Sequence, residues 1–549
     1  MLDAGGLATL EVGAMAISVC CGLSLGIVLL LSAFGLCSES EFRFGSYYAS
    51  HMVLQKEPAG AVVWGYGAVG GIINVTVWRE DSIFIQKVTA VSEDRALGVT
   101  GVWKVSLDPV APGGPFLIIA EQKFARGADR IVLKDVYFGD IWLCGGQSNM
   151  QMTVLQIINA SEELSVASDY PFIRLFQAGL HKSNQELNDL ASIKVQWSAP
   201  TAEILGNGNF TSFSAVCWLF GRYLYDKLQY PIGLVESCWG GTPIEVWSSK
   251  RVLSKCGLSY NVGYDSQVNE ETAPHQPNVL WNAMIHPLHR MAIKGAIWYQ
   301  GESNTDWHNA EYNCTFPAMI EDWRQVFHQG SGGATEIDFP FGFVQLSTYH
   351  NAVPDDSFSW LRWHQTADFG YAPNPKMKRT FMAVAMDLGD EKSPFGTIHP
   401  RYKQDVAYRL YLGAQAVAYG ETAIVFQGPF PKGLQLKNST ELIITYTQEL
   451  TVLELSKDIF EVCCCQKGNL SSCKWLAAPI IDHSINTLSL SLNECQQKIS
   501  AIRYAWTEWP CDLKKCPLYS KGYKLPAPSF VIQAAHNGLS SMSPIKLFL

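Results

Sequence analysis

Between residues 42 and 135, apolar and polar positions alternate in short segments that glycine and proline separate. The segments with this alternation are residues 62–66, 72–79, 83–90, 102–107 and 116–121. Alternation with a period of two is typical of strands with one buried face, and regular turn signals between them favour an antiparallel sandwich. We therefore expect an N-terminal β-sandwich domain over residues 41–134.

The pattern changes near residue 135, where buried strands begin to alternate with amphipathic helices. The expected strands are residues 131–143, 231–237, 294–299, 341–346 and 381–386, and the expected helices are residues 213–228 and 401–419. This alternation predicts an α/β domain, residues 135–420, with a parallel sheet and helices on both faces. Open sheets of this kind bind ligands at the carboxyl ends of their strands.

After residue 421 the helical period fades and a β pattern returns. Residues 442–446, 488–492 and 502–506 read as strands. We expect a small C-terminal β-rich domain, residues 421–549, that disulfides hold together.

The turn that follows residues 131–143 has the character of a nucleophile turn. Gly145 and Gly146 precede Ser148, and residues 149–158 carry apolar positions at roughly helical spacing. A serine between a strand and a helix has an accessible hydroxyl, and the helix N-terminus offers N–H groups to a developing oxyanion. The alternative is a glycine-rich turn in which Ser148 only caps the helix.

Composition narrows the class of protein. The chain has 549 residues, 48% hydrophobic and 17% charged, so it is a folded protein of several domains. The net charge of −9, without a basic cluster, argues against a nucleic-acid partner. The 17 Trp and 22 Tyr suit stacking on sugar rings, and they suit a large β-rich core equally well.

Several features indicate the secretory pathway. The apolar run 15–37 predicts a signal peptide or leader within residues 1–40, with a membrane anchor as the alternative; we expect cleavage and no membrane insertion afterwards. The cysteines after residue 460 are dense and lack zinc-site spacing, which predicts disulfides of undetermined connectivity. Six Asn-x-Ser/Thr triplets are candidate glycosylation sites: Asn74, Asn159, Asn209, Asn313, Asn438 and Asn469.

Four features at strand ends follow one another along the chain. They are Ser148, the Gly240-Gly241 turn, the turn from Gln300 to Asn304, and His399. Taken singly, each has an ordinary explanation as a turn, a helix cap or a helix start. In this order they resemble the conserved blocks of the SGNH (GDSL-like) hydrolases, which implies an SGNH-hydrolase-like sheet between the two β-rich domains.

A closer resemblance rests on longer motifs. Residues 146–150 (GQSNM), 237–245 (SCWGGTPIE), 298–304 (WYQGESN) and 398–400 (IHP) are similar to the sialate O-acetylesterase family, as are residues 52–58, 362–368 and 504–506. The resemblance runs from about residue 42 to 530. It implies a lysosomal or secreted serine esterase that removes acetyl esters from sialic acids, chiefly at the 9-hydroxyl, without a metal or an organic cofactor.

The resemblance also implies roles for individual residues. Ser148 would attack the acetyl carbonyl and His399 would act as the base. The oxyanion donors would be the N–H of Ser148, a glycine N–H at Gly240 or Gly241, and the side-chain amide of Gln300 or Asn304. Arg362, Gln147 and Glu302 are the candidate substrate-binding residues; Arg362 could instead form an internal ion pair, and Glu302 could organise local hydrogen bonds.

One position departs from the SGNH pattern. Gly396 stands three residues before His399, where many of these enzymes carry an acid. The group that orients His399 must then be Asp387, Asp390 or Glu391, or a backbone carbonyl. His286 and His289 are three residues apart without a carboxylate cluster, so we expect no metal site.

Two other functions remain open at this stage. One is a broader carbohydrate acetylesterase that acts, for example, on acetylated plant polymers. The other is a sialoglycan-binding protein that keeps the fold without the activity, although the presence of both Ser148 and His399 speaks against it. The oligomeric state is undetermined.

Overall fold

The computed structural model describes residues 42–94, 100–124, 127–258, 274–351, 355–453, 459–465, 474–495, 498–533 and 545–546. The expected leader, residues 1–40, lies outside these ranges. Within them, no helix has both the length and the apolar character needed to cross a membrane.

The centre of the molecule is a twisted sheet in which five of the seven main strands are buried along their whole length. They lie in the order β11 (Ile193–Ser198), β10 (Ile173–Ala178), β12 (Ile232–Cys238), β9 (Gly127–Gly146), β13 (Gly295–Tyr299), β14 (Phe341–Gln345) and β15 (Thr380–Val384). All neighbours are parallel except β11, which is antiparallel to β10. The predicted α/β class with a parallel sheet is therefore confirmed.

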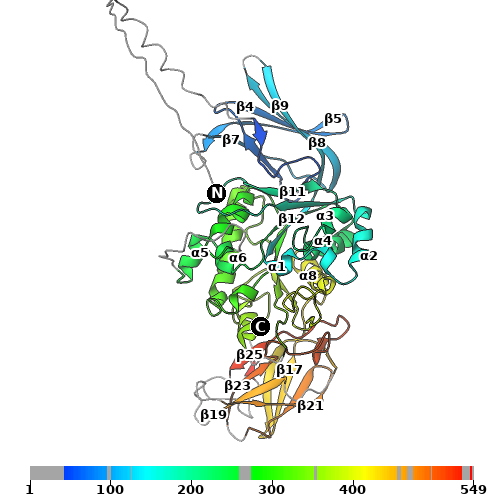
Figure 1. Cartoon of the computed structure of the whole chain (residues 1–549), viewed down its shortest axis with the longest axis vertical. Coiled ribbons are helices and arrows are strands. Elements are labelled where there is room, and N and C mark those ends of the chain that lie inside the picture. The colour runs from blue at the N-terminus through cyan, green and yellow to red at the C-terminus, as the bar shows by residue number, and fades with distance from the viewer. Residues whose placement is uncertain are drawn as a thin grey trace, which may run out of the picture. The chain divides into compact units, whose positions relative to one another are not determined.

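Helices cover both faces of this sheet (Figure 1). On one face, α4 (Ala215–Leu228) packs against α8 (Lys403–Val417) and β12. On the other, α6 (Tyr312–Gly330) packs against α5 (Lys250–Lys255) and α7 (Ser357–His364). Three short helices, α1 (Ser148–Gln151), α2 (Ala160–Ser165) and α3 (Ala202–Gly206), lie near the carboxyl ends of the strands or in the loops that follow.

The N-terminal β-rich part consists of antiparallel strands. One sheet has the order β1 (Arg43–Phe44), β3 (Val62–Tyr66), β7 (Thr100–Ser106), β6 (Ser92–Asp94). The other strands are β4 (Ile72–Arg79), β5 (Ser82–Ala90) and β8 (Gly113–Phe124), and β8 pairs with the first half of β9.

Strand β9 belongs to both the N-terminal part and the central sheet. Its first half pairs with β8, its middle pairs with β2 (Val53–Gln55), and its last residues pair with β12 and β13. The boundary expected between residues 134 and 135 thus falls inside one strand of 20 residues.

The C-terminal part is β-rich, as expected. It contains the sheets β21-β22-β17-β16-β26, β20-β19-β23-β25 and β18-β24. Their bounds are β16 (Pro431–Asn438), β17 (Glu441–Tyr446), β18 (Leu450–Val452), β19 (Phe460–Cys465), β20 (Lys474–Ala477), β21 (Ile480–His483), β22 (Thr487–Ser491), β23 (Lys498–Tyr504), β24 (Leu518–Ser520), β25 (Phe530–Gln533) and β26 (Ile545–Lys546).

Disulfides occur in both the central and the C-terminal parts, which confirms the expected use of cysteine. Those that join two described cysteines are Cys144–Cys217, Cys256–Cys314, Cys464–Cys495 and Cys511–Cys516. The first joins β9 to α4 four residues before Ser148. It therefore fixes the helix to the strand that carries the candidate nucleophile.

Candidate active site

Ser148 stands at the junction of β9 and α1, directly after two glycines. Gly146 has a φ of 140°, and a Cβ atom there would lie 2.1 Å from the carbonyl oxygen of Tyr299 on the neighbouring strand. Only glycine fits such a close approach in this conformation. The tight turn leaves Ser148 half-buried at the carboxyl edge of the sheet, as the sequence predicted.

His399 reaches Ser148 from the loop between β15 and α8. Its Nε2 lies 2.8 Å from Oγ of Ser148, and its Nδ1 lies 2.7 Å from the carbonyl oxygen of Phe395. A carbonyl oxygen can only accept, so Nδ1 carries the proton and Nε2 is the lone-pair nitrogen that faces the hydroxyl. This is the tautomer that a general base requires.

The acids expected beside His399 are engaged elsewhere, which corrects the sequence interpretation. Asp387 is fully buried and binds the guanidinium of Arg409 at 2.6 and 2.9 Å, as well as the hydroxyl of Tyr519. Asp390 binds Arg401 through two side-chain bonds of 2.6 and 3.1 Å. Each carboxylate pairs with a nearby arginine because a buried negative charge needs such a partner.

His399 is therefore oriented by a carbonyl, the alternative that the sequence left open. The third candidate acid, Glu391, is exposed and has no hydrogen bond to His399. The loop itself is closed by the N–H of His399, which donates to the carbonyl of Gly396 at 2.9 Å. Gly396 thus serves the turn that carries the base, with a φ of 89° that favours glycine.

The environment of His399 favours the neutral imidazole. Burial lowers its pKa below the ordinary value; the bond to Phe395 raises the pKa by less, and the nearby cation of Lys403 lowers it by a smaller amount again. The ring of Phe210 lies 5.1 Å from the imidazole, between centroids. The apolar ring thus contributes to the burial of the imidazole.

Backbone N–H groups offer the best donors for an oxyanion. Ser148 is the first residue of α1, so its N–H points out of the helix N-terminus, and among the described residues it has no acceptor. Gly240 lies beside the nucleophile, because a Cβ added to it would be 3.2 Å from Cβ of Ser148. The N–H of Gly240 donates to Oε1 of Gln151 at 2.8 Å, whereas that of Gly241 has no acceptor among the described residues.

Neither of the expected side-chain amides faces Ser148. Asn304 is fully buried; its Oδ1 accepts from the N–H of Ile244, and its Nδ2 donates to Glu245 at 3.1 Å. Gln300 donates to Oδ1 of Asn304 at 2.7 Å and accepts from the hydroxyl of Tyr312 at 2.9 Å. Both amides hold the turn in place through bonds that use their donors and acceptors, so they are not available to an oxyanion.

Gln147 and Glu302 also hold the site together from behind rather than facing a ligand. Oε1 of Gln147 accepts from the N–H groups of Gly301 and Ser303 at 3.4 and 3.3 Å. Glu302 accepts from Nδ2 of Asn149 at 2.5 Å. Both side chains are buried, so the expected substrate contact is corrected to a role in positioning the turn.

Asn149 connects the nucleophile turn to the base. Its Nδ2 also donates to the carbonyl of Ile398 at 2.9 Å, and its Oδ1 accepts from Nζ of Lys403 at 2.7 Å. Burial raises the pKa of Glu302 and lowers that of Lys403 to about 7. Asn149, Lys403, Gln151 and Phe210 were not assigned site roles from sequence, and of these only Asn149 belongs to the motif around Ser148.

Arg362 is engaged inside the fold and does not lie at an exposed position of the site, which corrects the expected substrate contact. It is fully buried, and it donates to the carbonyls of Leu346 and Ser347 at 2.9 and 2.7 Å and to those of Thr507 and Glu508 at 2.9 and 2.8 Å. Burial lowers its pKa to about 9. Arg362 therefore joins the loop after β14 to the segment after β23.

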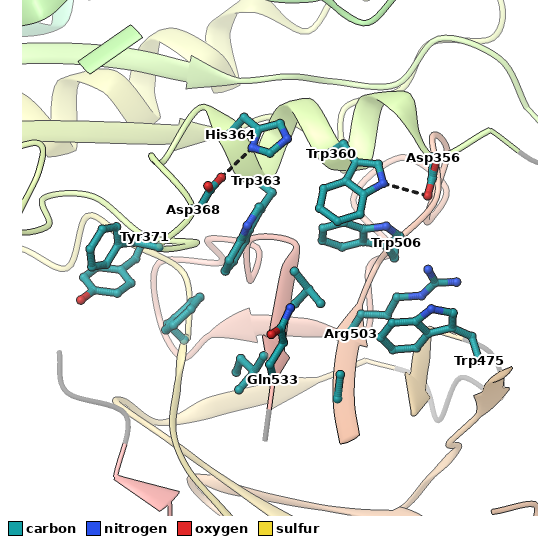
Figure 2. A pocket seen from close by; sticks show the side chains of 15 residues that line it. Asp356, Trp360, Trp363, His364, Asp368, Tyr371, Trp475, Arg503, Trp506 and Gln533 are labelled. Carbon is teal, nitrogen blue, oxygen red and sulfur yellow. Dashed lines mark hydrogen bonds and ion pairs between the residues drawn. The ribbon is translucent and has the colours of Figure 1, made fainter. Parts of the chain in front are cut away.

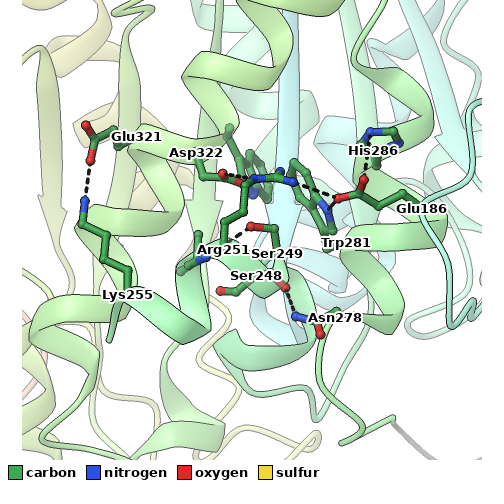
Figure 3. A network of polar contacts seen from close by, with 12 residues as sticks. Glu186, Ser248, Ser249, Arg251, Lys255, Asn278, Trp281, His286, Glu321 and Asp322 are labelled. Atoms are coloured by element: carbon green, nitrogen blue, oxygen red, sulfur yellow. Dashed lines mark hydrogen bonds and ion pairs between the residues drawn. The ribbon is translucent and has the colours of Figure 1, made fainter. Parts of the chain in front are cut away.

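His286 belongs to a polar network on the α5–α6 side of the sheet (Figure 3). Its Nε2 lies 3.7 Å from Glu186, which also accepts from the indole of Trp281 and from Arg251. Arg251 in turn pairs with Asp322 at 2.8 Å. His289 stacks on His286, and no cluster of three metal-binding side chains occurs among residues that the structure describes.

The candidate glycosylation residues differ in accessibility. Asn159, Asn209 and Asn438 are exposed, and Asn74 is half-buried on β4. Asn313 is half-buried on α6, and its Nδ2 donates to Asp368 at 2.6 Å. Asn469 lies outside the described residues.

Comparison with known proteins identifies the family. The family described as "Carbohydrate esterase, sialic acid-specific acetylesterase" matches residues 138–393, and "Sialate O-acetylesterase C-terminal domain" matches residues 433–534. Sialate O-acetylesterase of Mus musculus is 51% identical, covering 94% of this chain and 99% of the relative. The Homo sapiens protein of that name is also 51% identical, covering 95% and 99%. The chain belongs to the sialate O-acetylesterase family. It is therefore a carboxylic ester hydrolase.

A solved structure extends the comparison to the fold. A carbohydrate acetylesterase from Xanthomonas citri superposes with a TM-score of 0.72 at 26% identity, covering 90% of this chain and 100% of the other. This member of the sialate O-acetylesterase family thus shares its architecture with a bacterial acetylesterase, including the β-rich parts on either side of the central sheet.

Proposed function

We propose that this chain removes O-acetyl groups from sialic acids, chiefly from the 9-hydroxyl, through an acetyl-Ser148 intermediate. One observation carries the proposal: Nε2 of His399 lies 2.8 Å from Oγ of Ser148 while Nδ1 is held by the carbonyl of Phe395. This pair can activate a hydroxyl, and the names of the mammalian relatives supply the substrate class.

In the first step, Oγ of Ser148 attacks the acetyl carbonyl carbon while Nε2 of His399 takes the hydroxyl proton. The carbonyl oxygen becomes an oxyanion, which the N–H of Ser148 and a glycine N–H at Gly240 or Gly241 stabilise. For Gly240 to contribute, Oε1 of Gln151 must first release its N–H. The ester bond then breaks, and His399 gives its proton to the departing sugar hydroxyl.

In the second step, water replaces the sugar. Nε2 of His399, neutral again, takes a proton from the water as its oxygen attacks the acetyl-Ser148 carbonyl. The bond from the acyl carbon to Oγ breaks, the proton returns to Oγ, and acetate leaves. The lowered pKa of His399 keeps the imidazole in the form that both steps require.

Acetate release from 4-, 7- and 9-O-acetylated sialic acids tests this proposal. We expect the 9-O-acetyl ester to react fastest, and Ser148→Ala to abolish release and labelling by a fluorophosphonate probe while the protein stays folded. Ser165→Ala, an exposed serine on α2, is the matched control and should keep full activity. Near-full activity of Ser148→Ala would rule out the serine mechanism.

A second candidate is a broader carbohydrate acetylesterase. The observation that favours it is the fold shared with the Xanthomonas citri carbohydrate acetylesterase. Hydrolysis of acetylated xylan, compared with that of 9-O-acetyl sialic acid under the same conditions, separates the two: a higher kcat/KM on xylan would favour the second candidate.

The compartment proposed for this activity is the secretory pathway, with lysosomes or the extracellular space as the destination. The support is chemical: four disulfides among the described cysteines and three exposed Asn-x-Ser/Thr triplets suit an oxidising compartment. Mass spectrometry of the cellular protein should find glycans at Asn159, Asn209 and Asn438 more completely than at Asn313, whose amide is engaged. Unmodified asparagines and free cysteines throughout would contradict this setting.

A further inference from the structure

A large groove lies between α7 and the C-terminal sheet β20-β19-β23-β25. Its volume is about 760 Å³, and neither Ser148 nor His399 lines it. That volume is within the range of sites that hold small organic ligands. The mechanism described above makes no use of this space.

Aromatic side chains form both walls of the groove. Trp360 and Trp363 come from α7, whereas Trp475 on β20 and Trp506 after β23 come from the opposite wall (Figure 2). Trp360 is 41% exposed, although it lies against Trp506 with ring centroids 5.0 Å apart. An indole this exposed offers a flat apolar surface to a ligand.

The polar groups of the groove indicate the charge of its ligand. Arg503 is paired with Glu461 by bonds of 2.6 and 2.9 Å, and His364 is paired with Asp368 at 2.6 Å. The guanidinium of Arg503 and the imidazole of His364 therefore each already have a carboxylate partner. An anionic ligand would find no uncompensated cation there, and it would meet the carboxylate of Asp356 at the rim.

The remaining groups suit hydroxyls. Asp356 accepts from Nε1 of Trp360 at 3.0 Å and keeps further acceptor capacity, and the exposed amide of Gln533 can both donate and accept. Figure 2 shows Gln533 on the wall that faces Trp363. Flat apolar surfaces flanked by such groups fit a ring that has C–H bonds on its faces and hydroxyls around its edge. A pyranose sugar is such a ring.

The two walls are held in register by buried contacts. Arg362 of α7 bonds to the carbonyls of Thr507 and Glu508, directly after Trp506. On the inner face of the same helix, Nε2 of Gln365 at its C-cap donates to the carbonyl of Gln300, in the turn behind the active site. The groove is thus preformed, and a ligand would bind without closing it.

We propose that this groove is a second carbohydrate site that binds neutral sugar residues of a glycan chain. The site is separate from the catalytic centre, and it selects the uncharged part of a glycan rather than the sialic acid. The proposal does not depend on the identity of the ester that Ser148 cleaves.

Titration calorimetry of the full chain tests the proposal, with Ser148→Ala as the parent protein and a neutral tetrasaccharide of galactose, N-acetylglucosamine and glucose as the probe. We expect saturable binding, and we expect Trp360→Ala or Trp475→Ala to weaken it by about tenfold or more, as for removal of an aromatic anchor. Tyr408→Ala, an aromatic residue on α8 that is 43% exposed and outside the groove, should bind like the parent. Because Asn313 lies beside Asp368, enzymatically deglycosylated protein is used so that no glycan of the chain competes.

Three outcomes would overturn the proposal. The first is that the neutral tetrasaccharide does not bind to the folded parent protein. The second is that both tryptophan variants bind it as well as the parent does. The third is that free sialic acid or a long-chain fatty acid binds in a way that depends on Trp360 while the tetrasaccharide does not bind. Acetate release by the wild-type chain is measured separately. A failure of the esterase proposal would therefore appear in that assay and leave the binding result unaffected.

Discussion

At the scale of single residues, the proposed base, His399, is oriented by the backbone carbonyl of Phe395 and not by one of the acids expected from the sequence. A carbonyl fixes the tautomer of His399 but stabilises the imidazolium less than a carboxylate would. His399→Ala should lower kcat/KM for acetate release by about a thousandfold or more. Asp390→Asn, which removes a partner of Arg401 and not of His399, should stay within about tenfold of wild type. If Asp390→Asn lowers kcat/KM as much as His399→Ala does, at an unchanged melting temperature, the orienting group is Asp390 and not the carbonyl.

The pH dependence of activity follows from the same residue. The base must be neutral, and burial together with Lys403 lowers the pKa of His399, so protonation inactivates the enzyme only below the ordinary imidazole pKa of about 6.5. The acid limb of kcat/KM against pH should therefore lie below that value. Lys403, with a pKa of about 7, is charged in this acid range. Lys403→Met should consequently shift the limb to higher pH, and a shift to lower pH would contradict the electrostatic account.

At the scale of elements, the turn between β9 and α1 depends on the approach of one strand to another. Gly146→Ala would place Cβ 2.1 Å from the carbonyl oxygen of Tyr299, so β9 and β13 must separate. We expect a loss of about 3 kcal/mol or more in the free energy of unfolding, together with loss of activity. Gly127→Ala, on the same strand with a φ of 114° and no atom near the new Cβ, should cost about 1 kcal/mol. Denaturant unfolding of both variants measures the difference, and equal costs would contradict the steric argument.

The elements differ in how well the sequence predicts them. Short runs rich in β-branched and aromatic residues, bounded by glycine, located β3 and β4 to the residue. The helix expected over residues 149–158 is instead α1 (Ser148–Gln151) followed by a 3₁₀ turn (Val154–Gln156), since Thr153 and Gln156 form a capping box that starts a new turn. Helix α6 was not predicted, and Pro317 within it is one reason, as proline ordinarily ends a helix.

The candidate site was only partly predictable, because the sequence indicates where a residue lies along a strand but not which contacts orient its side chain. Ser148 and His399 could be found because each follows a buried strand, and parallel strands bring their carboxyl ends to one edge. The orientation of His399 by the carbonyl of Phe395 has no signature in the sequence, because any residue supplies a carbonyl. The direction in which the amide of Asn304 points depends on Ile244 and Glu245, which lie about 60 residues earlier in the chain.

At the scale of the whole molecule, Arg362 joins the central and C-terminal parts through four carbonyls. Arg362→Lys would leave several of these buried acceptors without donors, and we expect it to lower the free energy of unfolding by about 3 kcal/mol or more. Because Arg362 is buried and its guanidinium is held by backbone carbonyls, KM of the folded fraction should stay unchanged. Arg251→Lys, a half-exposed arginine paired with Asp322, should change stability by about 1 kcal/mol or less. If Arg362→Lys has a raised KM at wild-type stability, Arg362 contributes to substrate binding after all.

The continuity of β9 limits how this enzyme can be divided or recombined. A gene fragment that starts at residue 135 would encode Ser148 but begin within the strand that leads to it, without β2 and β8, which pair with residues 136–139 of β9. The fragment would lose these pairings, so exchange of the N-terminal part between relatives must join upstream of β8 and retain the β8–β9 hairpin. The catalytic part is therefore not a transferable module, in spite of the β-rich regions that flank it in sequence.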